Sequence, residues 1–243
     1  MNFDKVKALL VSNSVPYNRG YLDHCAHAIK GMVGDSSAPV LFFPYALQDH
    51  QSYVRRVRDR FAQIDIKVVS ATEVKDIQTA LHETSTVFVG GGNTFRLLHG
   101  FTSMKWHKAA LSILRERVLS GEVRYIGSSA GANLACPTIM TTNDMPIVTP
   151  DGFNALGIIP FQINPHYVDP DPRSSHMGET RDARIFEFHE ENVQPVVALR
   201  EGSWLNVEEG MVTLEGTSGA KIFRRGEQPQ ELVNGQIPPK LLL

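Results

Sequence analysis

The sequence predicts an α/β fold, a mostly parallel central sheet with helices on both of its faces. Short apolar runs alternate with helical patterns through the first half of the chain. The runs are apolar at consecutive positions, as in parallel strands that are buried on both faces. The chain has 243 residues, which is enough for one such domain with a substantial core. We therefore expect residues 1–243 to form a single domain.

The strands and helices of this sheet follow one another in order. Strands are expected at 8–11, 39–43, 66–69, 86–89 and 123–126. Helices are expected at about 21–32, 52–62 and 104–119. Two of the strands end on glycine, at Gly90 and at Gly127, so we expect sharp turns after them.

The last third of the chain has a different pattern. We expect a strand at 161–165 that stops at proline, a helix over about 178–190, a further core strand at 195–199, and short strands at 204–207, 211–214 and 221–223. Turns that contain glycine separate the short strands, which predicts a small antiparallel meander near one sheet edge. Residues 168–177 are polar and rich in proline, and this composition predicts a mobile loop.

Composition excludes several classes of protein. The formal net charge of −2 gives no global attraction to nucleic acid or to an anionic membrane. No signal-peptide layout and no membrane-spanning apolar run is present, so we expect a cytoplasmic protein. Cys25 and Cys136 lack metal-ligand spacing, and there is no H-E-x-x-H motif, so no metal and no other cofactor is expected. A homodimer is our working expectation for the assembly.

The segment Gly127-Ser128-Ser129-Ala130-Gly131 matches G-x-S-x-G and lies between a predicted strand and the start of a helix. This is the sequence context of a nucleophile elbow, in which the central serine takes a strained backbone conformation. Small neighbours are needed on either side because the turn leaves little room for side chains. We therefore select Ser129 as a candidate nucleophile; a strand-to-helix turn without chemistry is the alternative.

A second turn, Gly90-Gly91-Gly92-Asn93, also ends a parallel strand and so lies at the same edge of the sheet. The amide of Gly91 or Gly92 is expected to join that of Ala130 in an oxyanion hole. A phosphate-binding loop is the alternative. The segment lacks the lysine of G-x-x-x-x-G-K-[ST] and the spacing of G-x-G-x-x-G, so a nucleotide site is disfavoured.

A nucleophilic serine needs a base, and the base needs an acid that orients it. Among the nine histidines, His166 follows directly after the strand that ends at Pro165, and His176 in the polar loop is a weaker candidate. The acid is either Glu201, just after a predicted strand, or Asp144. Spacing alone does not separate these two carboxylates.

Several longer motifs resemble those of the peptidase E family of α-aspartyl dipeptidases. They lie at 90–95, 127–137, 141–146, 162–166, 178–181 and 201–204. The resemblance extends from about residue 9 to residue 223. It implies a fold related to the class I glutamine amidotransferases and the hydrolysis of dipeptides that begin with aspartate.

The resemblance also implies the roles of single residues. It assigns Ser129 as nucleophile and His166 as base, and favours Glu201 over Asp144 as the acid. It assigns Arg181 to the aspartyl side chain of the substrate, which agrees with the bidentate binding of carboxylates by guanidinium groups. Asn93 is expected to hold polar groups of the substrate, and we expect support of these side chains from Thr142, Asn143 and Glu179.

Two features depart from the family as we expect it. Ser128 stands where a bulkier aromatic residue is expected in the bacterial members, which leaves a second hydroxyl in the elbow. The loop 168–177 is longer than expected, so loop ordering is a candidate step in substrate entry.

The alternatives are a cyanophycinase-like hydrolase of β-aspartyl peptides and a non-enzymatic protein that binds a small anion. A glutamine amidotransferase is disfavoured because the elbow carries serine, and Cys136 is expected to be a core residue.

Overall fold

The computed structural model describes residues 3–103, 107–173, 175 and 178–243. Its main sheet has eight strands in the order β12-β9-β8-β1-β5-β4-β2-β3. Five of them are parallel: β1 (Ala8–Val11), β2 (Val40–Phe43), β3 (Val68–Ser70), β4 (Thr86–Val89) and β5 (Arg124–Ser128). The predicted fold class, a mostly parallel α/β sheet, is confirmed.

Helices cover both faces of the parallel strands, as predicted. They are α1 (Ala26–Val33), α2 (His50–Ala62), α3 (Ile77–Glu83), α4 (Thr94–Thr102), α5 (His107–Leu119) and α6 (Ala130–Ala135). Alternate side chains of β1 divide between the two faces. Leu9 and Val11 pack in the cluster that contains α1 and α2, whereas Ala8 and Leu10 pack in the larger cluster that contains α3 to α6. The apolar strands are therefore buried on both faces.

The antiparallel part of the main sheet begins at β1. The strand β8 (Ser203–Glu208) pairs antiparallel with β1, and β9 (Met211–Gly216) pairs antiparallel with β8. The short strand β12 (Gly235–Gln236) completes this edge, and the helix α8 (Pro239–Leu242) follows it. The predicted strands at 204–207 and 211–214 are thus confirmed as a meander at one edge of the sheet.

Three predicted strands, those at 161–165, 195–199 and 221–223, lie outside the main sheet, and the last of them corrects the expected meander. A second sheet has the order β11-β10-β7-β6. It consists of β6 (Gln162–Tyr167), β7 (Val196–Arg200), β10 (Ala220–Phe223) and β11 (Gln230–Leu232). Both faces of β7 are buried, Val197 and Leu199 in the large cluster and Val196 and Ala198 under α7 (Arg181–Glu191). A strand buried on both faces carries no sequence signal for the sheet that it joins.

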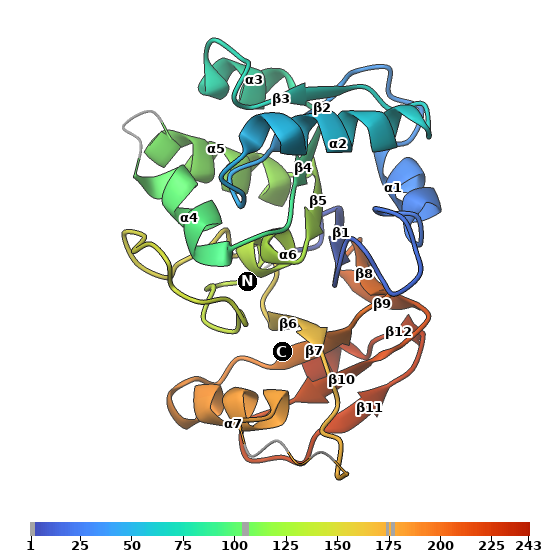
Figure 1. Cartoon of the computed structure of the whole chain (residues 1–243), viewed down its shortest axis with the longest axis vertical. Coiled ribbons are helices and arrows are strands. Elements are labelled where there is room, and N and C mark those ends of the chain that lie inside the picture. The colour runs from blue at the N-terminus through green and yellow to red at the C-terminus, as the bar shows by residue number, and fades with distance from the viewer. Residues whose placement is uncertain (1–2, 104–106, 174, 176–177) are drawn as a thin grey trace.

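The two sheets and their helices are arranged around one large apolar cluster. In Figure 1, α1 to α6 lie in the upper part of the view, whereas α7 and the strands of the second sheet lie in the lower part. Side chains of β6, β7 and β10 share the large cluster with side chains of the main sheet: Ile163, Val197 and Ile222 belong to the same cluster as Leu10. The second sheet is therefore held against the main sheet by apolar packing.

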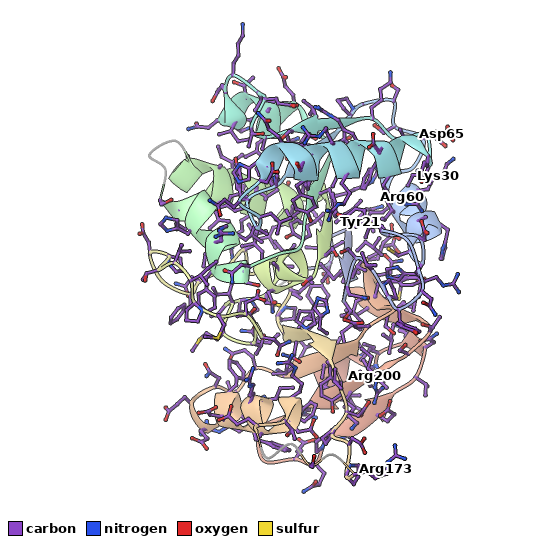
Figure 2. All side chains as sticks on the ribbon, viewed as in Figure 1. Tyr21, Lys30, Arg60, Asp65, Arg173 and Arg200 are labelled. Atoms are coloured by element: carbon purple, nitrogen blue, oxygen red, sulfur yellow. The ribbon has the colours of Figure 1, made fainter. Side chains whose placement is uncertain are left out.

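The predicted polar loop begins with an ion-pair network. Asp169 accepts hydrogen bonds from Arg200 Nε at 2.7 Å and from Arg200 Nη2 at 2.9 Å, and lies 2.7 Å from Lys221 Nζ. Arg200 also binds Glu231. Figure 2 shows Arg200 among the strands of the second sheet. Residues 168–173 form no helix or strand, and residues 174 and 176–177 of the predicted loop lie outside the described residues.

Several boundaries differ from the sequence-based expectation. The helices α3 and α4 were not predicted, although each begins with a capping side chain, Asp76 for α3 and Asn93 for α4. The helix expected from residue 21 begins only at Ala26. In the described part of the chain, no helix is long and apolar enough to cross a membrane.

Candidate active site

Three neighbouring strands of the main sheet place the candidate residues together. The strand β5 pairs with β1 on one side and with β4 on the other, all parallel. Ser12 follows β1, Ser129 follows β5 and Gly90 follows β4. Because parallel strands end at the same edge of a sheet, these segments meet at one edge, where ligand sites of α/β proteins form.

Ser129 lies in the sharp turn that the motif predicts. Its backbone has φ 53° and ψ −107°, an unusual conformation for a residue other than glycine. Such a conformation costs about 1–3 kcal/mol, which the surrounding structure must offset. A Cβ atom at Gly131 would come within 2.2 Å of the Val89 carbonyl oxygen, and one at Gly127 within 2.5 Å of the Gly131 carbonyl oxygen. The two outer glycines are therefore required by close packing within the elbow.

His166 lies inside β6, not on a loop after the strand as the sequence-based prediction had it. Pro165 pairs with Leu199 and Tyr167 pairs with Arg200, so His166 is the extra residue of a β-bulge. Its φ of 53° matches this irregularity. Proline is tolerated in β6 because this strand forms the edge of the second sheet, where it need not donate to a further strand.

The structure brings Ser129, His166 and Glu201 into one hydrogen-bonded series. Ser129 Oγ lies 2.8 Å from His166 Nε2, and His166 Nδ1 lies 2.6 Å from Glu201 Oε1. The side chains of His166 and Glu201 are 39% and 47% exposed, so the series opens to solvent. A nucleophile, a base and an orienting acid in this order are the arrangement of a catalytic triad.

Asp144 lies outside this series. Its Oδ2 accepts hydrogen bonds from the Thr94 backbone N–H at 2.8 Å, from the Thr94 hydroxyl at 2.6 Å and from the Thr142 hydroxyl at 3.1 Å. These contacts hold the loop that carries Asp144 against the first turn of α4. The geometry thus places Glu201, and not Asp144, next to the imidazole of His166.

The glycine-rich turn lies against the elbow. A Cβ atom at Gly91 would stand 3.1 Å from Ser129 Cβ, and one at Gly92, where φ is 136°, would stand 2.6 Å from the Ala46 carbonyl oxygen. Burial raises the pKa of Tyr53 to about 12, and a hydrogen bond from the Gly91 backbone lowers it in part. Among the described residues, we find no hydrogen-bond acceptor for the amides of Gly92 and Ala130.

Arg181 is the first residue of α7, and its guanidinium has no hydrogen bond or ion pair among the described residues. Partial burial and the charge of Arg184 lower its pKa, whereas the carboxylate of Asp144 opposes this effect. The interaction with Asp144 places Arg181 near the loop that packs on α4. An arginine that has no hydrogen-bond or ion-pair partner among the described residues is suited to bind a carboxylate.

Asn93 has a structural task in addition to any contact with substrate. Its Oδ1 accepts from the Arg96 backbone N–H at 3.0 Å, and its Nδ2 donates to the Met145 carbonyl oxygen at 2.8 Å. The side chain therefore caps α4 and ties the loop at Met145 to it.

The predicted supporting residues surround this site at different points. Asn143 Nδ2 donates to the Pro165 carbonyl oxygen at 2.7 Å, directly before His166. Thr142 contacts Thr94 and Asp144, and Glu179 forms an ion pair with Arg184 at 3.4 Å. Asn143 is thus the member of this group that holds the strand of the candidate base.

Three further predictions concern serine, cysteine and histidine side chains. Ser128 is fully buried, and its hydroxyl has no partner among the described residues, so it is not a second hydroxyl of the open site. Cys136 is fully buried, and its Sγ accepts from the Ile163 backbone N–H at 3.2 Å. His176 lies outside the described residues.

Sequence-based prediction missed Ser12 and Asn13, which follow β1. Ser12 Oγ accepts from the His166 backbone N–H at 2.9 Å, and Asn13 Oδ1 accepts from the Gly202 backbone N–H at 2.8 Å. Both side chains are buried. Neither lies in a motif, and their partners are more than 150 positions away in the chain, so no local signal identifies them. Over the described ranges, no group of three or more His, Cys, Asp or Glu side chains is arranged to hold a metal ion.

Comparison with known proteins finds relatives over nearly the whole chain. Residues 8–215 match the model of peptidase family S51. A protein of Streptomyces coelicolor (strain ATCC BAA-471 / A3(2) / M145) named "Peptidase E" is 48% identical over 234 residues, which cover 96% of this chain and 94% of that protein. A Drosophila melanogaster protein named "Probable alpha-aspartyl dipeptidase" is 42% identical over 225 residues, 92% of each chain.

Among solved structures, a crystal structure of a peptidase from an acI-B1 actinobacterium superposes with a TM-score of 0.66 and 14% identity, covering 96% of each chain. At that identity the likeness concerns the fold alone. The match to the family model, together with 48% identity over nearly the whole length, shows that this chain belongs to peptidase family S51.

Proposed function

We propose that this chain is a serine dipeptidase that hydrolyses dipeptides with an N-terminal aspartate. The observation that carries the proposal is the hydrogen-bonded series from Ser129 Oγ through His166 to Glu201. Membership of peptidase family S51 and the relatives named for peptidase E and alpha-aspartyl dipeptidase support the same activity. Ser129 is the nucleophile, His166 the base and Glu201 the acid that orients it.

The reaction begins with acylation of Ser129. As Ser129 Oγ bonds to the aspartyl carbonyl carbon, His166 Nε2 takes the hydroxyl proton, and the carbonyl electron pair moves onto oxygen. The C–N bond then breaks, and His166 returns the proton to the leaving amine. Water then attacks the carbonyl carbon of the acyl-enzyme while His166 takes a proton from it. His166 returns this proton to Ser129 Oγ as the bond to serine breaks, which releases aspartate and restores Ser129. Throughout, Glu201 holds the proton on Nδ1 and stabilises the imidazolium.

The oxyanion is held by backbone amides at the junction of the two turns. Ala130 belongs to the first turn of α6, whose amides have no acceptor within the helix. On the opposite side, the turn Gly90-Gly91-Gly92 lies against Ser129, so the amide of Gly91 or of Gly92 is the second donor. Donors that are in place before the reaction stabilise the charge that develops on oxygen.

Arg181 binds the side-chain carboxylate of the substrate. Its guanidinium has no partner among the described residues, and its partial burial strengthens a charge-assisted hydrogen bond. Asn93 retains one amide proton for a polar group of the substrate, because a side-chain amide has two and Met145 accepts one. An Asp-Xaa dipeptide is thus the proposed partner of this site.

Two further proposals concern the cellular compartment and the oligomeric state of the protein. We propose a cytoplasmic enzyme, supported by two free, buried cysteines, which suit a reducing compartment. A homodimer remains the proposed assembly.

The decisive experiment replaces each serine of the elbow. Ser129→Ala should abolish hydrolysis of Asp-Leu and labelling by a fluorophosphonate, with the fold intact by circular dichroism. Ser128→Ala is the matched control, since this neighbour is fully buried and should leave both activities in place. Full activity in folded Ser129→Ala protein would overturn the proposed nucleophile.

A substrate panel separates this function from its alternatives. We expect cleavage of α-Asp-Leu and none of β-Asp-Arg. Cleavage of β-Asp-Arg alone would favour the cyanophycinase-like activity. Absence of both hydrolysis and labelling would favour a protein that binds a small anion.

A further inference from the structure

Three consecutive residues, Val11 at the end of β1 and Ser12 and Asn13 after it, each bind a segment that carries one member of the proposed triad. The Val11 carbonyl oxygen accepts from the Ser129 backbone N–H at 2.9 Å. Ser12 Oγ accepts from the His166 N–H at 2.9 Å, and Asn13 Oδ1 accepts from the N–H of Gly202, next to Glu201, at 2.8 Å. The end of β1 therefore contacts all three segments.

Ser12 is the central member of this set and is fully buried. Its hydroxyl accepts from His166 and donates to the Leu199 carbonyl oxygen at 2.7 Å, so both of its hydrogen-bonding roles are used. Leu199 lies in β7, two residues before Glu201. A single hydroxyl thus joins the backbone of the candidate base to the strand that leads to the candidate acid.

The bulge in β6 explains why His166 needs this contact. Pairing with β7 passes from Pro165 directly to Tyr167, so the backbone N–H of His166 is left outside the ladder. A buried N–H without an acceptor is costly, and Ser12 Oγ supplies the acceptor. The same hydrogen bond stabilises the backbone conformation of His166, whose φ is positive.

The contact also links two separate sheets. Ser129 follows a strand of the main sheet, whereas His166 and Glu201 lie on and after strands of the second sheet. The side chains of His166 and Glu201 are 39% and 47% exposed, so packing around them is incomplete. Their positions relative to Ser129 therefore depend on backbone contacts, and the contacts of Ser12 join both strands of the second sheet.

We propose that Ser12 is a positioning residue that sets the backbone of His166 within reach of Ser129. The inference rests on the proposed function, since it concerns the geometry of that triad. Ser12 touches neither substrate nor reacting atoms; it acts through His166. Loss of its hydroxyl should lower the rate of chemistry more than the binding of substrate.

The test compares Ser12→Ala with Ser70→Ala. Ser70 is the matched control because it is also a fully buried serine at the end of a parallel strand. It ends β3, an edge strand of the main sheet, and its hydroxyl contacts Thr72 and, among the described residues, no residue of the site. For Ser12→Ala we expect kcat on Asp-Leu and the rate of fluorophosphonate labelling to fall about 10- to 100-fold, the scale of a small misplacement of catalytic groups. KM should stay within about twofold. Ser70→Ala should change the melting temperature but neither rate.

A second variant guards against loss of folding. Ser12→Cys keeps nearly the same shape but has a weaker donor and acceptor, so it should fold and lose rate to a smaller extent. Labelling of folded Ser12→Ala or Ser12→Cys protein at the parent rate would overturn the inference.

Labelling also separates failure of the inference from failure of the proposed function. If the parent protein is labelled but cleaves no aspartyl dipeptide, the proposed substrate is wrong, and the labelling rates still test Ser12. If the parent protein is not labelled, the proposed triad is wrong, and the inference is overturned with it.

Discussion

The Glu201 carboxylate lies 2.6 Å from His166 Nδ1, on the side of the imidazole ring opposite Ser129. His166 lies near the end of β6, and Glu201 lies in the turn after the neighbouring parallel strand β7. An acid in this place fixes which ring nitrogen carries the proton.

Glu201→Gln should lower kcat on Asp-Leu by about 10³- to 10⁴-fold, because an amide favours the wrong tautomer of the base. The melting temperature should change little, since the pair is partly exposed and such pairs contribute little stability. Steady-state kinetics and thermal unfolding measure the two effects. A loss of less than about tenfold in folded protein would argue against Glu201 as the acid.

Asp144→Ala should act mainly on stability. The carboxylate binds the backbone N–H and the hydroxyl of Thr94 in the first turn of α4. Loss of a capping side chain costs about 0.5–2 kcal/mol of unfolding free energy, measurable by urea denaturation. We expect a smaller loss of kcat than in Glu201→Ala, and the reverse order would transfer the orienting role to Asp144.

Arg181→Ala should remove the preference for aspartate. The ratio of kcat/KM for Asp-Leu to that for Leu-Leu should fall by about 10- to 100-fold, since loss of a charged hydrogen bond costs about 1.5–3 kcal/mol. Arg184→Ala is the matched control, one turn further along α7 and paired with Glu179. An unchanged ratio in Arg181→Ala would show that another group binds the aspartyl side chain.

Asp169→Asn should destabilise the protein at neutral pH but not in acid. Arg200 and Lys221 hold the pKa of Asp169 well below its usual range. A carboxyl whose pKa is depressed by folding adds stability above its unfolded pKa of about 3.9, and this stability is lost as the pH falls further. Allowing for solvent around the carboxylate, we expect a loss of about 1 kcal/mol at pH 7.

The measurement is urea unfolding of parent and variant at pH 7 and at about pH 3, where the difference in unfolding free energy should shrink. Asp171→Asn is the control, because Asp171 lies two residues further in the same loop and pairs only with Arg173 at 3.4 Å within the described part. A constant difference across this pH range would contradict the role of the Asp169 network.

Both cysteines should be unreactive in the folded protein. Burial raises the pKa of the Cys25 thiol and of the Cys136 thiol to about 12 in each case. Only the thiolate reacts readily with Ellman's reagent, so neither thiol should be labelled at pH 8 before denaturant is added. Two thiols should then react in urea, and rapid labelling of the native protein would contradict the burial of these side chains.

Local patterns were sufficient for much of the fold. The strands β1, β2 and β4 are apolar runs whose single polar residue is Thr86, and their burial on both faces follows from that composition. The elbow at Ser129 was also predictable from the sequence, because contacts within a few residues or with the neighbouring strand require glycine at positions 127 and 131. The helices α3 and α4 were missed although Asp76 and Asn93 are ordinary capping residues.

The second sheet was not predictable in the same way. The strand β7 is a mostly apolar run like those of the main sheet, and its composition does not show which strands it pairs with. Likewise, Pro165 suggested the end of a strand, but on an edge strand it costs no ladder hydrogen bond, so β6 continues through His166 to Tyr167.

From its sequence alone, this protein can be recognised as a parallel α/β fold with a serine elbow, because apolar periodicity and small-residue turns are local properties. The position of Glu201, and not Asp144, next to His166, the bulge at His166 and the contact of Ser12 with that bulge required the tertiary structure. Each depends on hydrogen bonds between residues far apart in the chain, 35 positions for His166 and Glu201 and 154 for Ser12 and His166. Spacing along a chain carries no information on such distances until the two sheets have packed together.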